Sequence, residues 1–214
     1  RADGIVASYG KDVKVTGFYA KPTDQGKALS STVELEYDNV YGAKVDAKFG
    51  VVAATAGYTV FQDAALNGYE YVNDKAKLVE SVDLDDNKIW NVGVAFDVAK
   101  NLNLSANYMK SSEKYVTDDD DAIVVGLSYA GAKAAKAGSW GLNASYYDQG
   151  AGTVVAHTMD GIYFDEGFKG YSVGANYALA KNIVAGVTYY DLESKEAKGT
   201  PDAQTLWSQV VFSF

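Results

Sequence analysis

The chain has 214 residues, a formal charge of -9, one histidine, no cysteine, and 21 glycines against 2 prolines. Its mean hydropathy is -0.16, and no uncharged apolar run approaches the roughly 18 residues of a spanning helix, which excludes a helical membrane protein. A membrane β-barrel is not excluded, because only every second strand residue faces lipid. The absence of cysteine excludes disulfides and thiolate sites. The negative charge argues against a nucleic-acid partner, which needs a basic surface.

Strands are predicted along most of the chain, which fits one domain over residues 1–214. Two of them, at 4–9 and 13–20, flank a tight Gly10-Lys11-Asp12 turn. Alternation of apolar with polar or small residues, a period of two, predicts the others. These fall at 33–37, 45–51, 90–98, 102–108, 123–129, 140–147, 171–179, 183–190 and 204–214. Residues 53–62 either continue the strand before them or form another, so the total is about 11 or 12.

The connections alternate between short turns and long polar loops. Val98-Ala99-Lys100-Asn101 and Leu179-Ala180-Lys181-Asn182 are short turns, whereas the stretches after Lys110, Tyr147 and Asp191 are longer and polar. Residues 92–114 and 173–195 align without gaps, which indicates a repeated hairpin. Short turns at one end and long loops at the other are typical of an outer-membrane barrel. The predicted fold class is therefore an all-β, antiparallel up-and-down transmembrane β-barrel.

A soluble β-sandwich would show the same alternation, so the composition of the two faces decides between them. The face opposite the large apolar residues is mainly Gly, Asn and Ser, whereas a soluble surface usually carries Lys, Glu and Thr. Aromatic residues also lie near the strand ends, where a girdle would meet lipid headgroups. They are Trp90, Tyr129, Trp140, Tyr146, Tyr177 and Tyr189. Both features favour the membrane barrel.

The last residues, Leu206-Trp207-Ser208-Gln209-Val210-Val211-Phe212-Ser213-Phe214, resemble the terminal strand of bacterial outer-membrane proteins. That resemblance implies that Phe212 and Phe214 form a signal for the outer-membrane assembly machinery. Four segments are similar to the C-terminal barrel of the S-layer-homology porins of diderm Firmicutes. They are Ala156-His157-Thr158-Met159-Asp160-Gly161, the strand at 170–177, Leu179-Ala180-Lys181-Asn182 and Thr205-Leu206-Trp207-Ser208-Gln209. The similarity is clearest over residues 124–214.

Members of that family carry an N-terminal domain that grips peptidoglycan, followed by a stalk and a trimeric barrel of about 16 strands. The resemblance thus implies a homotrimer and a peptidoglycan link through a domain that this sequence does not contain. It also implies that the 11 or so predicted strands are part of a larger barrel. The strand directions give the same expectation. If the chain ends on the periplasmic side at Phe214, counting back through 11 strands makes the first strand run toward the periplasm, as though another strand preceded it.

No catalytic constellation is found, and the chain is not expected to be an enzyme. His157 is the single histidine, so neither a histidine-based triad nor a multi-histidine metal site is available. Acidic pairs such as Asp165 and Glu166 are expected by chance in the loops of an acidic protein. No cofactor and no bound metal are predicted.

Charged side chains on the predicted inward face are the candidate pore residues. They are Lys14, Glu34, Glu36, Lys44, Asp46, Lys48 and Asp97. Charge inside a barrel requires water or an opposite charge, so these residues favour a wet lumen. Opposed acidic and basic walls would create a transverse field at a constriction. Alternatively, these charges pair across neighbouring strands, and the two interpretations are compatible.

Two loops have alternative interpretations. Residues 63–87 form the longest predicted connection, which either folds inward to narrow the pore or forms a lid outside it. Asp118, Asp119, Asp120 and Asp121 form an acidic run that could hold a divalent cation and bridge lipopolysaccharide phosphates. The other interpretation of this run is a solvated gatekeeper loop.

The sequence thus predicts a porin of the bacterial outer membrane, a passive channel whose partners are membrane lipid and small hydrophilic solutes and ions. The net charge of -9 gives a weak expectation of cation preference. One alternative is a structural barrel that anchors the envelope to the cell wall through a segment absent here. Another is a soluble β-protein such as an adhesin module.

Overall fold

A computed structural model describes residues 2–22, 26–30, 33–72, 75–114, 119–154, 167–195 and 202–213. Within these ranges the chain is almost entirely β-strand, with one short 3-10 turn, η1 (Ala151–Thr153), and no α-helix. No helix in these ranges is long and apolar enough to cross a membrane. The predicted all-β class is confirmed.

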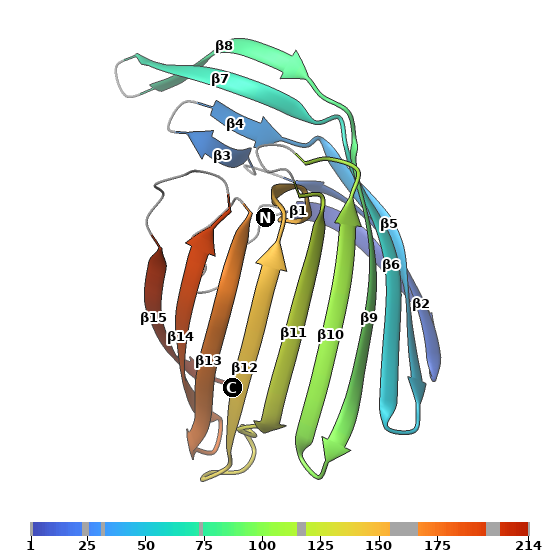
Figure 1. Ribbon diagram of the computed structural model, residues 1–214, viewed down its shortest axis with the longest axis vertical. Coiled ribbons are helices and arrows are strands. Elements are labelled where there is room, and N and C mark those ends of the chain that lie inside the picture. Colours follow the sequence, from blue (N-terminus) through green and yellow to red (C-terminus); the bar gives the residue numbers. More distant parts are fainter. Residues whose placement is uncertain are drawn as a thin grey trace.

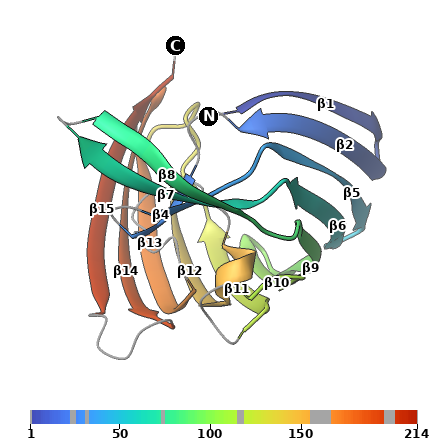
Figure 2. The same ribbon diagram turned by 90° about the horizontal axis from the view of Figure 1, so that it is seen from above.

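Eleven strands form one antiparallel sheet, called the wall, which curves around a space that is open on one side and is called the enclosed space below (Figures 1 and 2). Their order is β1 (Ala2–Gly10), β2 (Val13–Pro22), β5 (Asn39–Phe49), β6 (Val52–Gln62), β9 (Asn87–Ala99), β10 (Leu102–Ser111), β11 (Asp121–Ala130), β12 (Trp140–Gln149), β13 (Phe168–Ala180), β14 (Ile183–Ser194) and β15 (Ala203–Phe212). This confirms the up-and-down arrangement. β1 and β15 each have a partner on one side only, so the sheet is open between them.

Four further strands form a second antiparallel sheet, called the upper sheet. Their order is β3 (Gly26–Ser30), β4 (Val33–Glu36), β7 (Ala65–Val72) and β8 (Lys75–Asp83). The upper sheet lies beyond the loop ends of the wall strands, and β7 and β8 cross the opening that the wall surrounds (Figures 1 and 2).

The upper sheet corrects two expectations about the strands. Residues 33–36 form a strand outside the wall, because β4 pairs with β3 and β7 and with no wall strand. Residues 63–87 contain the β7–β8 hairpin instead of one long loop. β6 is a strand of its own, between β5 and β9, and β5 pairs directly with β2 with no strand from residues 33–37 between them.

The connections differ between the two ends of the wall, as predicted. Most turns at the lower end in Figure 1 are short, although residues 131–139 make a longer one there. The β9–β10 and β13–β14 hairpins share a bulge, which skips Val98 in one hairpin and Leu179 in the other. Asn101 and Asn182, three residues after these positions, have positive φ angles of 63° and 66°. The repeat seen in the sequence is therefore also a repeat of backbone geometry.

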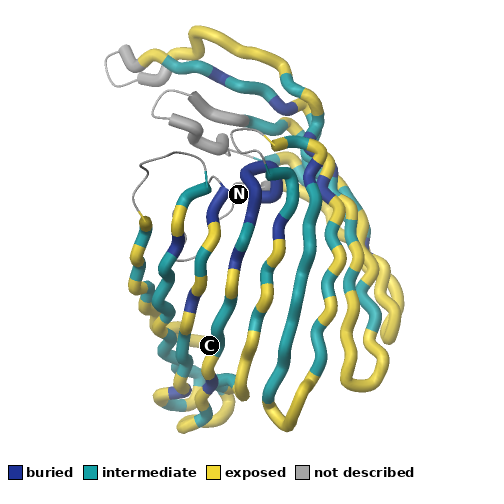
Figure 3. Tube along the Cα trace, viewed as in Figure 1, coloured by how far each residue is buried: buried dark blue, intermediate teal, exposed yellow. Residues whose placement is uncertain are grey.

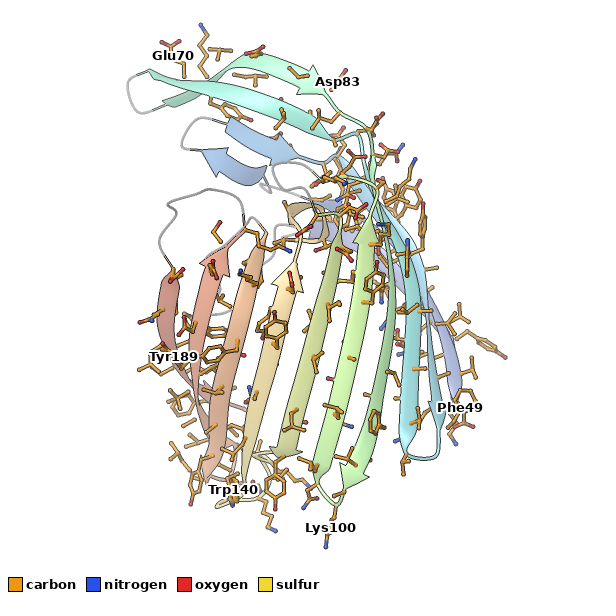
Figure 4. The ribbon with its side chains drawn as sticks, viewed as in Figure 1. Phe49, Glu70, Asp83, Lys100, Trp140 and Tyr189 are labelled. Atoms are coloured by element: carbon orange, nitrogen blue, oxygen red, sulfur yellow. The ribbon has the colours of Figure 1, made fainter. Side chains whose placement is uncertain are left out.

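The outer, convex face of the wall is apolar and exposed. Among the large hydrophobic side chains exposed there are Val15, Tyr41, Val45, Tyr58, Val92, Val94, Val125, Leu127, Leu142, Val173, Val187, Leu206 and Val210. Phe49 and Tyr189 point away from the enclosed space in Figure 4. Aromatic pairs occur at two levels. Trp90 and Tyr108 have ring centroids 5.3 Å apart near the loop ends, and Tyr129 and Trp140 have centroids 5.5 Å apart near the turn ends.

Candidate functional site

The inner face of the wall is lined by small and hydrogen-bonding side chains. From β10 to β15, the described inner-face residues include no charged side chain. The polar ones include Ser105, Asn107, Ser128, Asn143, Ser145, Asn176, Thr188 and Gln209. Such a surface can hydrate over the part of the wall below the upper end.

Glycines next to the asparagines keep this surface flat. A Cβ atom at Gly93 would collide with the side-chain oxygen of Asn107 on the neighbouring strand. A Cβ atom at Gly174 would lie 2.9 Å from Oδ1 of Asn143. The glycines therefore give the amide side chains room to lie along the wall instead of extending into the enclosed space.

A group of charged residues lies on the inner face of β2 and β5, near the lower ends of these strands. Lys14 faces Asp46 across the two strands, and Lys44 and Lys48 lie two residues to either side of Asp46. Lys44 Nζ is 3.0 Å from Asp46 Oδ2. The Thr55 hydroxyl of β6 donates a hydrogen bond of 3.0 Å to Asp46 Oδ1. Four of the predicted pore residues are therefore brought together here.

The other predicted pore residues lie elsewhere. Asp97 is on the inner face of β9, where the Asn103 amide donates a hydrogen bond of 3.0 Å to it. Glu36 is in the upper sheet, where its carboxylate accepts hydrogen bonds from the Asn67 amide at 2.8 Å and the Tyr69 hydroxyl at 2.6 Å. Glu34 is in the same strand, and its side chain lies outside the described part. Because β4 is not a wall strand, these glutamates do not form an acidic wall opposite the lysines.

A turn that was not predicted from the sequence packs on the inner face near the upper end. This inner turn, residues 150–154, includes η1 and is buried against β10 and β11 (Figure 3). The fully buried Asn87 donates a hydrogen bond of 2.8 Å to the carbonyl of Gly152. The Ser111 hydroxyl donates one of 2.6 Å to Asn87 Oδ1. Asn87 and Ser111 both point inward from the wall, so the turn reduces the space that the wall surrounds.

A small apolar core supports the inner turn. Val154 packs with Tyr147, Phe168 and Leu192, all of them buried and all on the inner side of the wall. The Tyr147 hydroxyl also lies 3.2 Å from the Ser172 hydroxyl. Most of the wall has no such core, because its inner face is polar. The inner turn is thus fixed by apolar packing as well as by the Asn87 hydrogen bonds.

Acidic loop residues at the upper end are paired with lysines. Lys195 Nζ lies 2.5 Å from Asp119 Oδ2 and 2.6 Å from Asp148 Oδ1. Lys110 Nζ lies 2.9 Å from Asp120 Oδ1. Asp118 lies outside the described residues, and Asp121 is the first residue of β11. The described residues include no group of three or more potential metal ligands.

These ion pairs shift the pKa values of Asp120 and Lys195, which both lie outside the strands. The hydrogen bond from Lys110 lowers the pKa of Asp120 below its ordinary value of 3.8. Burial lowers the pKa of Lys195, but the carboxylates of Asp119 and Asp148 outweigh burial and raise it above 10.5. The Asp120 contribution to stability is therefore lost as the pH falls through the lowered pKa. The Lys195 contribution is complete below the ordinary lysine pKa and is lost as the pH rises through the raised value.

Replacing Lys195 with methionine is expected to loosen the loops that it joins. Both carboxylates are partly exposed, so we expect the local opening free energy around residues 119–121 and 148–154 to fall by about 1 kcal/mol. Amide hydrogen exchange of these segments measures it, and the difference from wild type should disappear above the raised lysine pKa. Lys169→Met, which removes the exposed pair with Glu193, is the control. Equal exchange in wild type and Lys195→Met would contradict the role of Lys195.

The remaining predicted residues lie at or beyond the edges of the described structure. Phe212 is the last residue of β15, is exposed, and faces Ile183. Phe214 lies outside the described residues, as do His157, Asp165 and Glu166. The assembly signal therefore stays a prediction.

Comparison with known proteins finds similar folds among solved structures only. No protein-family model matches the chain, and no curated protein matches it. The outer membrane channel DcaP of Acinetobacter baumannii matches 99% of this chain and 62% of its own length, with 14% identity and a TM-score of 0.50. OccK3 (OpdO) of Pseudomonas aeruginosa matches 99% of this chain and 70% of its own, with 11% identity and a TM-score of 0.43.

The chain thus spans 62% of the length of the DcaP channel. At 14% identity this likeness establishes the fold alone. It supports the antiparallel up-and-down barrel fold predicted from the sequence, and it does not confirm the resemblance to the S-layer-homology porins. The fold of this chain is that of an outer-membrane β-barrel channel, with its sheet open between β1 and β15.

Proposed function

We propose that the chain forms the wall of a passive diffusion channel in the bacterial outer membrane, open to small hydrophilic solutes and ions. The observation that carries this proposal is the contrast between the two faces of the wall. Large apolar side chains are exposed on the outer face, whereas the inner face of the same strands is lined mainly by Gly, Ser, Asn and Thr, with its apolar core confined to the upper end. An apolar exterior and a polar interior are the arrangement of a water-filled barrel in lipid.

In the conducting form that we propose, the free edges of β1 and β15 are both paired. Each unsatisfied backbone group in hydrocarbon costs several kcal/mol, so an open edge is not stable in a bilayer. The homotrimer implied by the resemblance to the S-layer-homology porins would place three such channels in one assembly.

The purified protein, folded in detergent and added to a planar lipid bilayer, is expected to produce stepwise openings with a linear current–voltage relation. The polar inner face gives the physical reason, because its hydroxyl and amide groups can replace part of the hydration shell of passing ions. Single-channel recording measures this, and a trimer would show the steps in groups of three. Heat-denatured protein in the same detergent is the control.

A different outcome would favour the structural alternative. If circular dichroism shows folded β-sheet in lipid and recordings show no current steps, the diffusion channel is refuted. The barrel would then serve as an envelope anchor.

A further inference from the structure

The charges on the inner face have the opposite sign to the charge of the whole chain. The described inner-face residues of the wall include three lysines, Lys14, Lys44 and Lys48, against two aspartates, Asp46 and Asp97. The formal charge of this face is therefore positive, although that of the chain is -9. The acidic residues that make the chain negative lie mainly in the upper sheet and in the loops of the upper end.

Lys14 and Lys48, near the lower end of the wall, form no salt bridge with a carboxylate in the described residues. Asp46 is engaged by Lys44 and by the Thr55 hydroxyl. Neither Lys14 nor Lys48 forms an ion pair with any residue in the described ranges. Lys48 lies diagonally across from Lys14 in the β2–β5 register, a spacing of about 7–8 Å between such neighbours. Two ammonium groups without a salt bridge thus face the same part of the enclosed space, and Asp46, which lies opposite Lys14, is already bound by Lys44.

These lysines border a hollow of about 410 Å³ on the inner side of the wall. Its charged lining is three lysines, Lys11, Lys14 and Lys48, against two aspartates, Asp12 and Asp46, and its neutral polar lining is Thr55, Ser105 and Asn107. Gly93 is part of the lining, and the absence of a side chain there makes room for the Asn107 and Thr55 side chains in the lining. The hollow therefore combines ammonium groups on one side with hydroxyl and amide donors on the other.

We infer that this hollow is a binding station for small solutes that carry a carboxylate or phosphate group. Oxyanions accept charge-assisted hydrogen bonds from lysine and further hydrogen bonds from hydroxyl and amide groups. The lysines lie within one Debye length of each other, about 10 Å at 0.1 M salt, so their fields add. As a consequence the channel prefers anions, contrary to the expectation from net charge. The inference rests on the proposed channel for its effect on transport, whereas binding itself does not require conduction.

The test compares the wild type with the double variant Lys14→Gln/Lys48→Gln. Inorganic phosphate is titrated into the detergent-folded protein by calorimetry, and the reversal potential is measured in a potassium chloride gradient across a bilayer. We expect phosphate affinity to fall about tenfold or more in the double variant, since hydrogen bonds to charged groups are lost. In the wild type the reversal potential should lie nearer to the equilibrium potential of chloride. In the double variant it should shift toward the equilibrium potential of potassium.

Two further variants keep the test specific. Lys100→Gln/Lys181→Gln removes the same charge from turns outside the hollow and is expected to leave phosphate affinity unchanged; Figure 4 shows Lys100 at the lower end of the β9–β10 hairpin. Lys14→Arg/Lys48→Arg keeps the charge and is expected to retain binding.

Equal phosphate affinity in the wild type and Lys14→Gln/Lys48→Gln would overturn the inference, as would a cation-selective wild-type channel. Phosphate binding that depends on these lysines in a protein without conductance would instead refute the channel and support the station.

Discussion

Replacing Gly152 with alanine is expected to displace the inner turn from the wall and to raise the single-channel conductance. A Cβ atom at this position would overlap the carbonyl oxygen of Glu113 and would lie 2.6 Å from the Ser111 hydroxyl. Backbone cannot yield as a flexible side chain does, so we expect a local cost of about 1–3 kcal/mol. The turn contacts the inner face, and its release widens the upper part of the enclosed space. Bilayer recording gives the conductance, and amide exchange at residues 150–154 reports the displacement.

The control for Gly152→Ala is Gly17→Ala on β2. There the nearest atom to a new Cβ is the Gly42 carbonyl oxygen, at 4.0 Å, an ordinary contact. A second variant, Asn87→Ala, removes the hydrogen bonds to Gly152 and Ser111 without adding volume, and it should change conductance in the same direction as Gly152→Ala. If both variants increase exchange at the turn while conductance stays the same, the turn is not part of the constriction.

Removing the β7–β8 hairpin should also increase conductance and admit larger solutes. The hairpin crosses the opening of the wall (Figure 2), so its loss shortens and widens the path at the upper end. The backbone suits the deletion, because Leu84 N–H donates a hydrogen bond of 2.8 Å to the Ala64 carbonyl. An Asn-Gly turn can therefore join Ala64 to Leu84 in place of residues 65–83. Conductance and swelling of liposomes in sugars of increasing size measure the effect.

Glu70→Gln is the matched control for the hairpin deletion. Glu70 is exposed and points away from the wall in Figure 4, so this substitution should not alter solute passage. An unchanged size limit in a deletion variant that still folds would show that solutes bypass the upper sheet. The hydrogen bonds of Glu36 to Asn67 and Tyr69 would then serve only the stability of that sheet.

The wall strands could be predicted from the sequence because each of them has an apolar face toward lipid and a polar face toward the enclosed space. From Trp90 onward, large apolar residues alternate with Gly, Asn and Ser, so both the strand and its two faces can be recognised. The repeated turn before Asn101 and Asn182 also fixed the hairpin register locally. These signals lie within about ten residues of one another, a range in which pattern reasoning is effective.

The assignment of Glu34 and Glu36 to the wall failed because alternation predicts a strand but not its partner. The pairing of β4 with β7 joins residues about thirty positions apart, and nothing local distinguishes it from pairing with β5. The inner turn was missed for a related reason, since its anchor, Asn87, is distant in sequence. One signal was present: Gly150-Ala151-Gly152-Thr153-Val154 is an uncharged run of small residues at an end of the barrel where other loops are acidic.

The two levels of aromatic rings also define the thickness of membrane that suits this protein. Trp140 and Tyr146 on β12, and Tyr171 and Tyr177 on β13, are six positions apart on the outer face. Six residues of strand span about 20 Å, and a tilt of about 40° reduces the height to about 15 Å. A bilayer with long acyl chains would have to thin around such a belt, at a cost for each ångström of mismatch. Short-chain lipids would therefore be the better host for this wall.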